Sequence, residues 1–522
     1  MNKIYAALAA LTLALSLGLT AAAQTTAIDS PVTEGATTTP KSAASPTAAP
    51  QQGAPKVPKQ LKLGKVNVSG SLRVRSESYG WFETPGFQDD YTFGAAQLRL
   101  SLGQQREKWD WLVEGQFTGL INLPERAVAP APRGQVGLGA SYFAANGTQD
   151  ASAVLKQAYI KAKGVFGDGR SSLKVGRFEF VDGAETTPKD ATLAALKRER
   201  LAHRLVGNFG FSHVGRSFDA VQYVREGKSS NLTFVGGRAV EGVFQLRALK
   251  ELDVDFWYGA FTKPLASKNT VSEFRLFGLH YHDGRGALKT DNRTAAARRT
   301  DTGNIRVNTV GGHYIAAVKT RRGTLDLLAW DAGQFGSWGV QSHRAGAGSL
   351  EGGFQPGGAL GKVKAWVRAG YFRSTGDSDP TDARHETFFQ VLPTPRVYAR
   401  FPFYNLMNSE DAFAQVSLKP HARLTLRADI HRLRLSHAGD LWYSGGGAFQ
   451  ETTFGYQGRL SGGRKSLGTL FDMSADVSLT PTTTLTLYGA GVRGGTVMSS
   501  IYPAGGSNPT ARFVYAELTK RF

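Results

Sequence analysis

Arginine residues recur at alternating positions in several short stretches of this 522-residue chain. Within residues 66–79, apolar and polar side chains alternate, which places Arg73 and Arg75 together on the polar face. The same parity places Arg99 and Arg427 on the polar faces of two further stretches. A guanidinium donates two parallel hydrogen bonds to a carboxylate and stays charged at physiological pH. Arginines at successive depths along one passage would therefore offer a series of weak sites to an anionic solute.

Three further charged residues extend this candidate set. Arg368 is placed less clearly by parity, because Trp366 and Phe372 share its face. Glu179 and Asp472 are carboxylates that would hold neighbouring arginines in place and weaken their grip on an anion. For each of these arginines, a structural ion pair or a charge at a rim is the alternative interpretation.

Other patterns that could do chemistry are weaker. His280 and His282 lie on one strand face as a possible metal pair, but no third ligand of clear spacing follows. Asp377, Asp379 and Asp382 could bind Ca²⁺, but they lack the Gly and terminal Glu of an EF-hand loop, which favours a solvated loop. The chain has no cysteine and no Gly-x-Ser-x-Gly motif. We therefore expect no cofactor, no metal and no catalytic residue.

The elements that would position these residues are strands with two different faces. Strict alternation continues in four other stretches, which are residues 96–105, 109–118, 424–430 and 471–479. In the last nine residues, apolar side chains from Val514 to Phe522 share one face, with Lys520 as a charged exception that can snorkel. An edge strand of a soluble sheet is the alternative for this last segment. Strands of about ten residues with one apolar face are typical of transmembrane β-barrels.

Short and long connections alternate between these strands. The long polar connections are residues 120–151, 284–304, 375–411 and 436–466. With about 25 residues for a strand and its connection, the 459 residues of 64–522 predict about 18 strands, and 16 fit the alternation equally well. The predicted fold class is an all-β, transmembrane, antiparallel β-barrel. Residues 189–205 predict one short loop helix, which would either cap the rim or form a constriction or lid within the pore.

The N-terminal residues are predicted to lie outside this barrel. Residues 1–23 combine Lys3, an apolar run and a stretch of alanines, which is typical of a secretory signal peptide. Residues 24–63 are rich in Pro, Ala and Thr and predict a disordered periplasmic segment. Residues 64–522 are then the barrel domain.

The charge of the chain restricts its partners. There are 62 Lys and Arg against 42 Asp and Glu, a formal net charge of +20. Nucleic acid, anionic lipid and an anionic solute could each explain this excess, but the sequence has no nucleic-acid-binding module. We expect part of the excess to contact outer-membrane lipid and lipopolysaccharide, and the rest to attract anions into the lumen.

Three stretches, in order along the chain, resemble motifs of the alginate export family of outer-membrane proteins. Residues 175–179 are close to the family's Gly-Arg-Gln-Glu, with Phe178 in place of Gln. Residues 200–220 follow a pattern that ends Arg-Ser-Phe-Asp-Gly, with Ala220 in place of Gly. Residues 370–408 contain the family-like segments Thr-Phe-Phe and Leu-Pro-Thr-Pro.

The resemblance implies a monomeric barrel in the outer membrane of a Gram-negative bacterium. It also implies passive export of an anionic polyuronate through an arginine-lined pore. By the motif match, Arg177 and Asp219 would belong to that pore. The partners would be anionic polysaccharide or small anions, with periplasmic export components as a further possibility.

The chain is thus predicted to be a passive pore rather than an enzyme. A general anion-selective porin for small solutes is the nearest alternative. An outer-membrane hydrolase, and a structural barrel or adhesin with a blocked lumen, are alternatives from other classes.

Overall fold

The computed structural model describes residues 61–128, 137–394 and 398–522. The predictions for residues 1–23 and 24–60 lie outside this described part. Leu61–Leu63 form a short strand, β1, which pairs with β2, so ordered structure begins slightly before the predicted boundary at residue 64.

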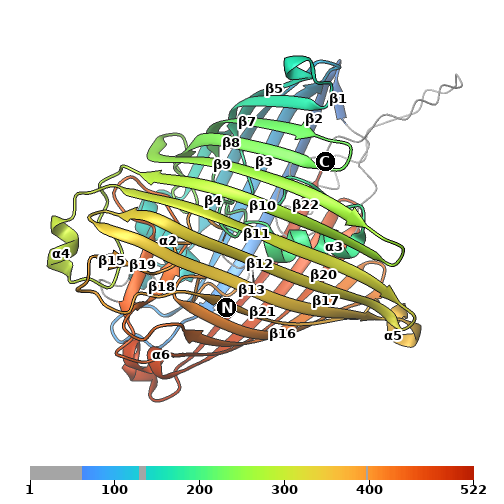
Figure 1. The fold of residues 1–522 in the computed structure, drawn as a ribbon. Helices are drawn as coiled ribbons and strands as arrows, with labels where there is room; N and C mark the ends of the chain where they lie inside the picture. Colours follow the sequence, from blue (N-terminus) through green and yellow to red (C-terminus); the bar gives the residue numbers. More distant parts are fainter. Residues whose placement is uncertain (1–60, 129–136, 395–397) are drawn as a thin grey trace, which may run out of the picture. The chain divides into compact units, whose positions relative to one another are not determined.

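The described residues form a closed antiparallel β-barrel (Figure 1). The main sheet has 20 strands, and two of them, β1 and β15 (Arg384–His385), are short additions, so 18 strands close the barrel. The first nine are β2 (Val66–Gly80), β3 (Asp90–Gln105), β4 (Trp109–Ile121), β5 (Ala151–Lys163), β6 (Ser171–Phe178), β7 (Phe218–Glu226), β8 (Asn231–Val240), β9 (Glu251–Ala266) and β10 (Thr270–Asp283). The other nine are β11 (Ile305–Thr320), β12 (Gly323–Trp338), β13 (Gln341–Pro356), β14 (Trp366–Ser374), β16 (Ser409–His421), β17 (Leu424–Leu435), β20 (Ser466–Thr480), β21 (Thr483–Gly494) and β22 (Thr510–Arg521). The predicted fold class is confirmed, and the strand number is the 18 that alternation alone could not separate from 16.

Pairing of the first and last long strands closes the barrel. β2 pairs with β22 from Ser71 opposite Arg521 to Gly80 opposite Arg512. Phe522 continues this pairing, because its backbone N–H and C=O both bond Gly70, at 3.1 and 2.9 Å. Because β2 pairs with β22, no edge of the 18-strand ring is left unpaired.

The connections differ in length at the two ends of the barrel. One end carries short turns, such as residues 321–322 and 481–482, and the other carries the long connections that the sequence predicts. This asymmetry places the long connections at the extracellular side. They hold a small second sheet of β18 (Leu441–Gly445) and β19 (Tyr456–Leu460), together with α2 (Gly137–Asn146), α4 (Ala295–Thr300) and α6 (Thr496–Ile501).

The helix predicted near residues 189–205 is present as α3 (Ala191–Leu196), continued by a π-helical turn, η3 (Lys197–Leu201). The prediction of a single helix was too low, because the described residues contain four others, which include α5 (Gly358–Lys362). These helices are five to ten residues long and carry weak periodic signals. No helix in the described ranges is long and apolar enough to cross a membrane.

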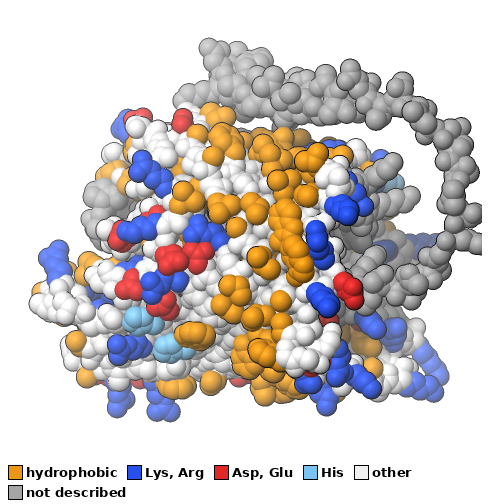
Figure 2. Space-filling model, turned by 90° about the horizontal axis from the view of Figure 1, so that it is seen from above, with side chains coloured by type: hydrophobic (Ala, Val, Ile, Leu, Met, Phe, Trp, Pro, Cys, Tyr) orange, Lys and Arg blue, Asp and Glu red, His pale blue; other side chains and the backbone are white. Residues whose placement is uncertain are grey.

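The two faces of the strands meet different surroundings. Outward side chains such as Leu100, Val113, Phe117 and Met473 are 42 to 52% exposed. Apolar side chains of this kind form a band across the face in Figure 2. Inward positions are polar or aromatic and mostly buried, which is the alternation expected of a barrel in lipid.

Candidate functional site: the constricted barrel interior

Two long extracellular connections fold back into the barrel and meet there, and their described residues are 179–217 for the first and 375–394 and 398–408 for the second. Val206 and Leu392 form a parallel bridge, and the backbone N–H of Gly207 donates to the Leu392 carbonyl at 2.7 Å. Of the two interpretations left open by the sequence, a cap at the rim or a constriction within the pore, the geometry favours the constriction.

Local sequence explains how residues 190–201 enter the interior. Asp190 caps α3 by accepting from the backbone N–H groups of Thr192 and Leu193, at 2.9 and 3.1 Å. The apolar face of the segment is buried in the main aromatic core and consists of Leu193, Leu196 and Leu201. One turn further, the Lys197 ammonium donates to the Glu273 carboxylate of β10 at 2.7 Å. A cap, an apolar face and an ion pair therefore fasten the segment to the wall.

Three guanidiniums converge on the buried carboxylate of Glu351, on β13. Arg200 donates to it at 2.9 Å, Arg204 lies 3.5 Å away, and Arg368 of β14 donates at 3.0 Å. Arg368 also donates to Asp326. Because three cations share two carboxylates, this part of the interior keeps an excess of positive charge.

A second pair of arginines contacts the C-terminal half of the inserted segment, residues 179–217. Arg73 donates to the carbonyl of Gly210 at 2.6 Å, and Arg75 donates to the carbonyl of Phe211. Arg75 also donates to Nδ1 of His213 at 3.3 Å. Burial, with both arginines beside it, keeps the pKa of His213 well below its usual value, so the ring stays neutral and can accept. Arg73 and Arg75 are therefore buried and bind the inserted segment, rather than being exposed charges.

Arg99 lies in a separate buried network. It donates to Glu179 at 2.9 and 3.1 Å and to Gln116 at 2.9 Å, and Lys156 lies 3.7 Å from Glu179. Glu179 reaches the interior because the chain leaves β6 at Phe178 and turns inward. Glu179 was predicted to orient an arginine, and it does contact one. That arginine is Arg99 of β3, which is not the strand that precedes Glu179.

Arg427 is the most accessible of the predicted arginines on the inner face. Its side chain is 21% exposed, against 1% for Arg368. It donates to Asp429 at 2.7 Å on the same strand. Asp472 also faces inward but accepts from the hydroxyl of Tyr488, at 2.9 Å.

Arg177 and Asp219 were predicted to line the lumen, and the structure places them on the outer face instead. They are opposite each other on β6 and β7, and two hydrogen bonds of 2.6 and 2.7 Å join them. Arg177 shares its face with the exposed Val175, and Asp219 shares its face with the exposed Val221. The prediction for these two residues came from the motif match alone and did not use strand parity. Parity decides which face of a strand a side chain occupies.

Several functional contacts were missed by the sequence argument. Arg216 donates to carbonyls of three segments, among them Leu392 at 2.9 Å and Ala448 at 3.0 Å. Arg200, Arg204 and their partner Glu351 were not singled out either. The cluster of basic residues at 197–204 was a sequence signal that could have pointed to Arg200 and Arg204. It gives no information on which strand the segment contacts.

The candidate metal ligands do not form a metal site. Within the described residues, no group of three His, Cys, Asp or Glu side chains is arranged to hold an ion. His280 and His282 face outward on β10. Asp377, Asp379 and Asp382 each accept from the backbone N–H two residues further on, at 2.9 to 3.1 Å, which is the geometry of local turns.

One buried carboxyl of the inserted segment titrates near neutrality. Asp182 accepts from the backbone N–H groups of Leu205 and Val206, at 3.2 and 2.9 Å. Burial raises the pKa of Asp182 from 3.8 to about 7, although these hydrogen bonds and Arg275 oppose the shift.

Comparisons with known proteins agree with this architecture. The family model described as alginate export matches residues 139–501. Among solved structures, the barrel is similar to Pseudomonas aeruginosa OccK2 (OpdF), with 9% identity and a TM-score of 0.51, covering 87% of this chain and 98% of that one. It is also similar to P. aeruginosa OccK9 (OpdG), with 10% identity, a TM-score of 0.50 and the same coverage. No curated protein matches in sequence. The chain belongs to the alginate export family and is an outer-membrane pore of a Gram-negative bacterium.

Proposed function

We propose that this barrel carries an anionic polyuronate across the outer membrane by diffusion, without a cofactor and without bond chemistry. A polyuronate presents a carboxylate on every sugar, so it meets a cation at each step through a passage of arginines. Weak successive sites let such a polymer enter and also leave. The description of the family as alginate export supports this substrate class.

The excess of guanidinium groups at the constriction carries the proposal. Arg200, Arg204 and Arg368 share Glu351 and Asp326 there. Arg427, with its partly exposed side chain, is the cation best placed to contact a solute. In this arrangement the buried arginines set a positive potential, and Arg427 supplies hydrogen bonds to a passing carboxylate.

Single-channel recording in planar bilayers tests this proposal. The barrel should give anion-selective current under a KCl gradient, and uronate oligomers should block that current. Arg427→Gln should weaken block about tenfold, since a hydrogen bond to a charged group contributes about 1.5 kcal/mol. Arg432→Gln is the matched control, because it removes the same charge from an exposed position on the outer face of the same strand.

The outcomes separate the alternatives. Anion-selective current without oligomer block would identify a general anion porin. No current would point to a blocked barrel. Equal block in the two variants would remove Arg427 from the solute path, and hydrolysis of polyuronate or phospholipid would identify an enzyme.

A further inference from the structure

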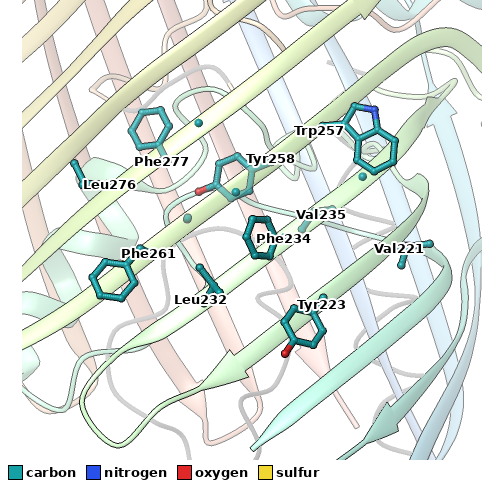
Figure 3. Close-up of a pocket in the computed structure, with 14 residues that line it drawn as sticks. Val221, Tyr223, Leu232, Phe234, Val235, Trp257, Tyr258, Phe261, Leu276 and Phe277 are labelled. Carbon is teal, nitrogen blue, oxygen red and sulfur yellow. The ribbon is translucent and has the colours of Figure 1, made fainter. Parts of the chain in front are cut away.

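An apolar groove of about 590 Å³ runs along the outer wall between β7 and β10 (Figure 3). Phe234, Trp257 and Phe261 line it. Its floor is formed by Gly259 and Gly278, which lie directly opposite each other on β9 and β10. A Cβ added at Gly278 would meet no atom within 4 Å, whereas a Cβ added at Gly259 would meet the Phe234 ring at 3.0 Å. The floor is therefore open to an apolar chain at Gly278 and covered by Phe234 at Gly259.

A polar hollow of about 480 Å³ adjoins this groove. The two hollows share Gly236 and Trp257, so they form one continuous depression. The remaining lining of the polar hollow includes Asp219, Arg238, Asp255, His280 and His282. Figure 2 shows basic, acidic and histidine side chains gathered next to the apolar band on one face. The depression is therefore apolar at one end and charged at the other.

The charged end lies toward the extracellular side. β8 ends at Val240 and β9 begins at Glu251, and the connection between them belongs to the end with the long connections. Arg238 donates to Asp255 at 2.8 and 3.1 Å, and Asp255 lies 3.5 Å from Nδ1 of His282. Arg238 also lies 3.6 Å from Asp253 and 4.0 Å from Glu251, and its side chain is still 41% exposed. This places charged donors and acceptors at the level of outer-leaflet head groups.

We propose that this depression binds an acylated sugar phosphate of the outer leaflet, separately from the conduction pathway. One acyl chain occupies the groove over Gly278, beside the Phe234 ring. The sugar lies against Trp257, and the phosphate accepts from Arg238.

Three observations favour this ligand over a simple phospholipid. The depression is amphipathic and continuous, which suits an amphiphile with its chain and head group in line. Trp257 lies flat over Gly236, where an added Cβ would meet the ring at 2.3 Å, and it is 66% exposed, so an open ring face is offered to a sugar. The carboxylates of Asp219 and Asp255 provide acceptors for sugar hydroxyls beside the donor for phosphate. The glycerol of phosphatidylglycerol also carries hydroxyls, but it offers no ring to lie against Trp257.

Native mass spectrometry of the full-length protein in detergent tests the site, with diphosphoryl lipid A and phosphatidylglycerol as competing probes. Lipid A should be retained in preference to phosphatidylglycerol. Gly278→Leu fills the groove and should lower lipid A retention about tenfold, or about 1.4 kcal/mol. Gly115→Leu is the matched control, because Gly115 faces outward on β4 and also has no atom within 4 Å of an added Cβ.

Equal retention of lipid A by the two glycine variants would overturn the proposal, since the bound lipid would then be a non-specific layer around the apolar outer face of the barrel. Equal retention of the two probes by the unsubstituted protein would also overturn it. Arg238→Gln leaves the groove intact and should lose lipid A while it retains phosphatidylglycerol, which keeps the test decisive if Gly278→Leu does not fold. Conductance should not change in Arg238→Gln, so failure of this site and failure of the proposed pore function are distinguishable.

Discussion

Glu351 neutralises the charges that fasten the inserted segment at the constriction. It is fully buried and faces Arg200, Arg204 and Arg368 within 3.5 Å. Glu351→Gln leaves these cations buried with one fewer anion, so we expect a loss of about 3 kcal/mol in the free energy of unfolding. Urea unfolding in lipid vesicles, followed by tryptophan fluorescence, measures the loss. Glu410→Gln is the control on the outer face, and its expected cost is below about 1 kcal/mol. Equal costs in the two variants would show that the converging charges do not stabilise the interior.

At the scale of single residues, parity predicts the face of a strand residue well and its partners poorly. Arg73 and Arg99 face inward because lipid accepts only apolar side chains on the alternate positions. Arg177 lies near the extracellular end of β6, where polar side chains are tolerated on both faces, so its polarity gives no information on its face. Val175 does give that information, and its parity places Arg177 outside.

At the scale of the element, the inserted segment should respond to pH through Asp182. The folded segment binds the proton of this carboxyl more tightly than the released segment, because the pKa rises from 3.8 to about 7 on burial. Docking is therefore favoured by acid and weakens as the pH rises from about 4 to about 7. Limited proteolysis of residues 179–217 should be slower at pH 5 than at pH 8. Asp182→Asn should abolish the difference, since Asn stays neutral and still accepts from Leu205 and Val206.

The control for this prediction is Asp190→Asn. Asn caps a helix as well as Asp does, so this variant should keep the pH dependence of the unsubstituted protein. If Asp182→Asn retains the same dependence, another group controls the segment.

The existence of this element was predictable, and its position was not. Asp190 before an apolar run is a helix start signal, and residues 189–205 were predicted to be helical. The contact with β13 depends on a partner some 150 residues away, and no local pattern encodes that distance. The same limit explains why Glu273 and Glu351 were missed.

At the scale of the whole barrel, Arg216 joins three extracellular connections. Its guanidinium donates to Gly207 at 3.1 Å, Leu392 at 2.9 Å and Ala448 at 3.0 Å, which belong to three different connections. These carbonyls are buried, and a planar fork can satisfy them together, whereas a single ammonium cannot. Arg216→Lys should therefore loosen all three segments while it keeps the charge. We expect more frequent current fluctuations and a higher mean conductance in planar bilayers.

The matched control for Arg216→Lys is Arg285→Lys. Arg285 also donates to several carbonyls of a connection, including those of Gln450 and Thr453 at 2.6 and 2.7 Å. Among the described residues, its side chain donates to that connection and to Asp283 and to neither of the segments that enter the interior. Arg285→Lys should leave both the mean current and its fluctuations unchanged. If the two variants behave alike, the connections regulate current only from the rim. If only Arg216→Lys opens the channel, the inserted segments act as one constriction whose width depends on a single guanidinium.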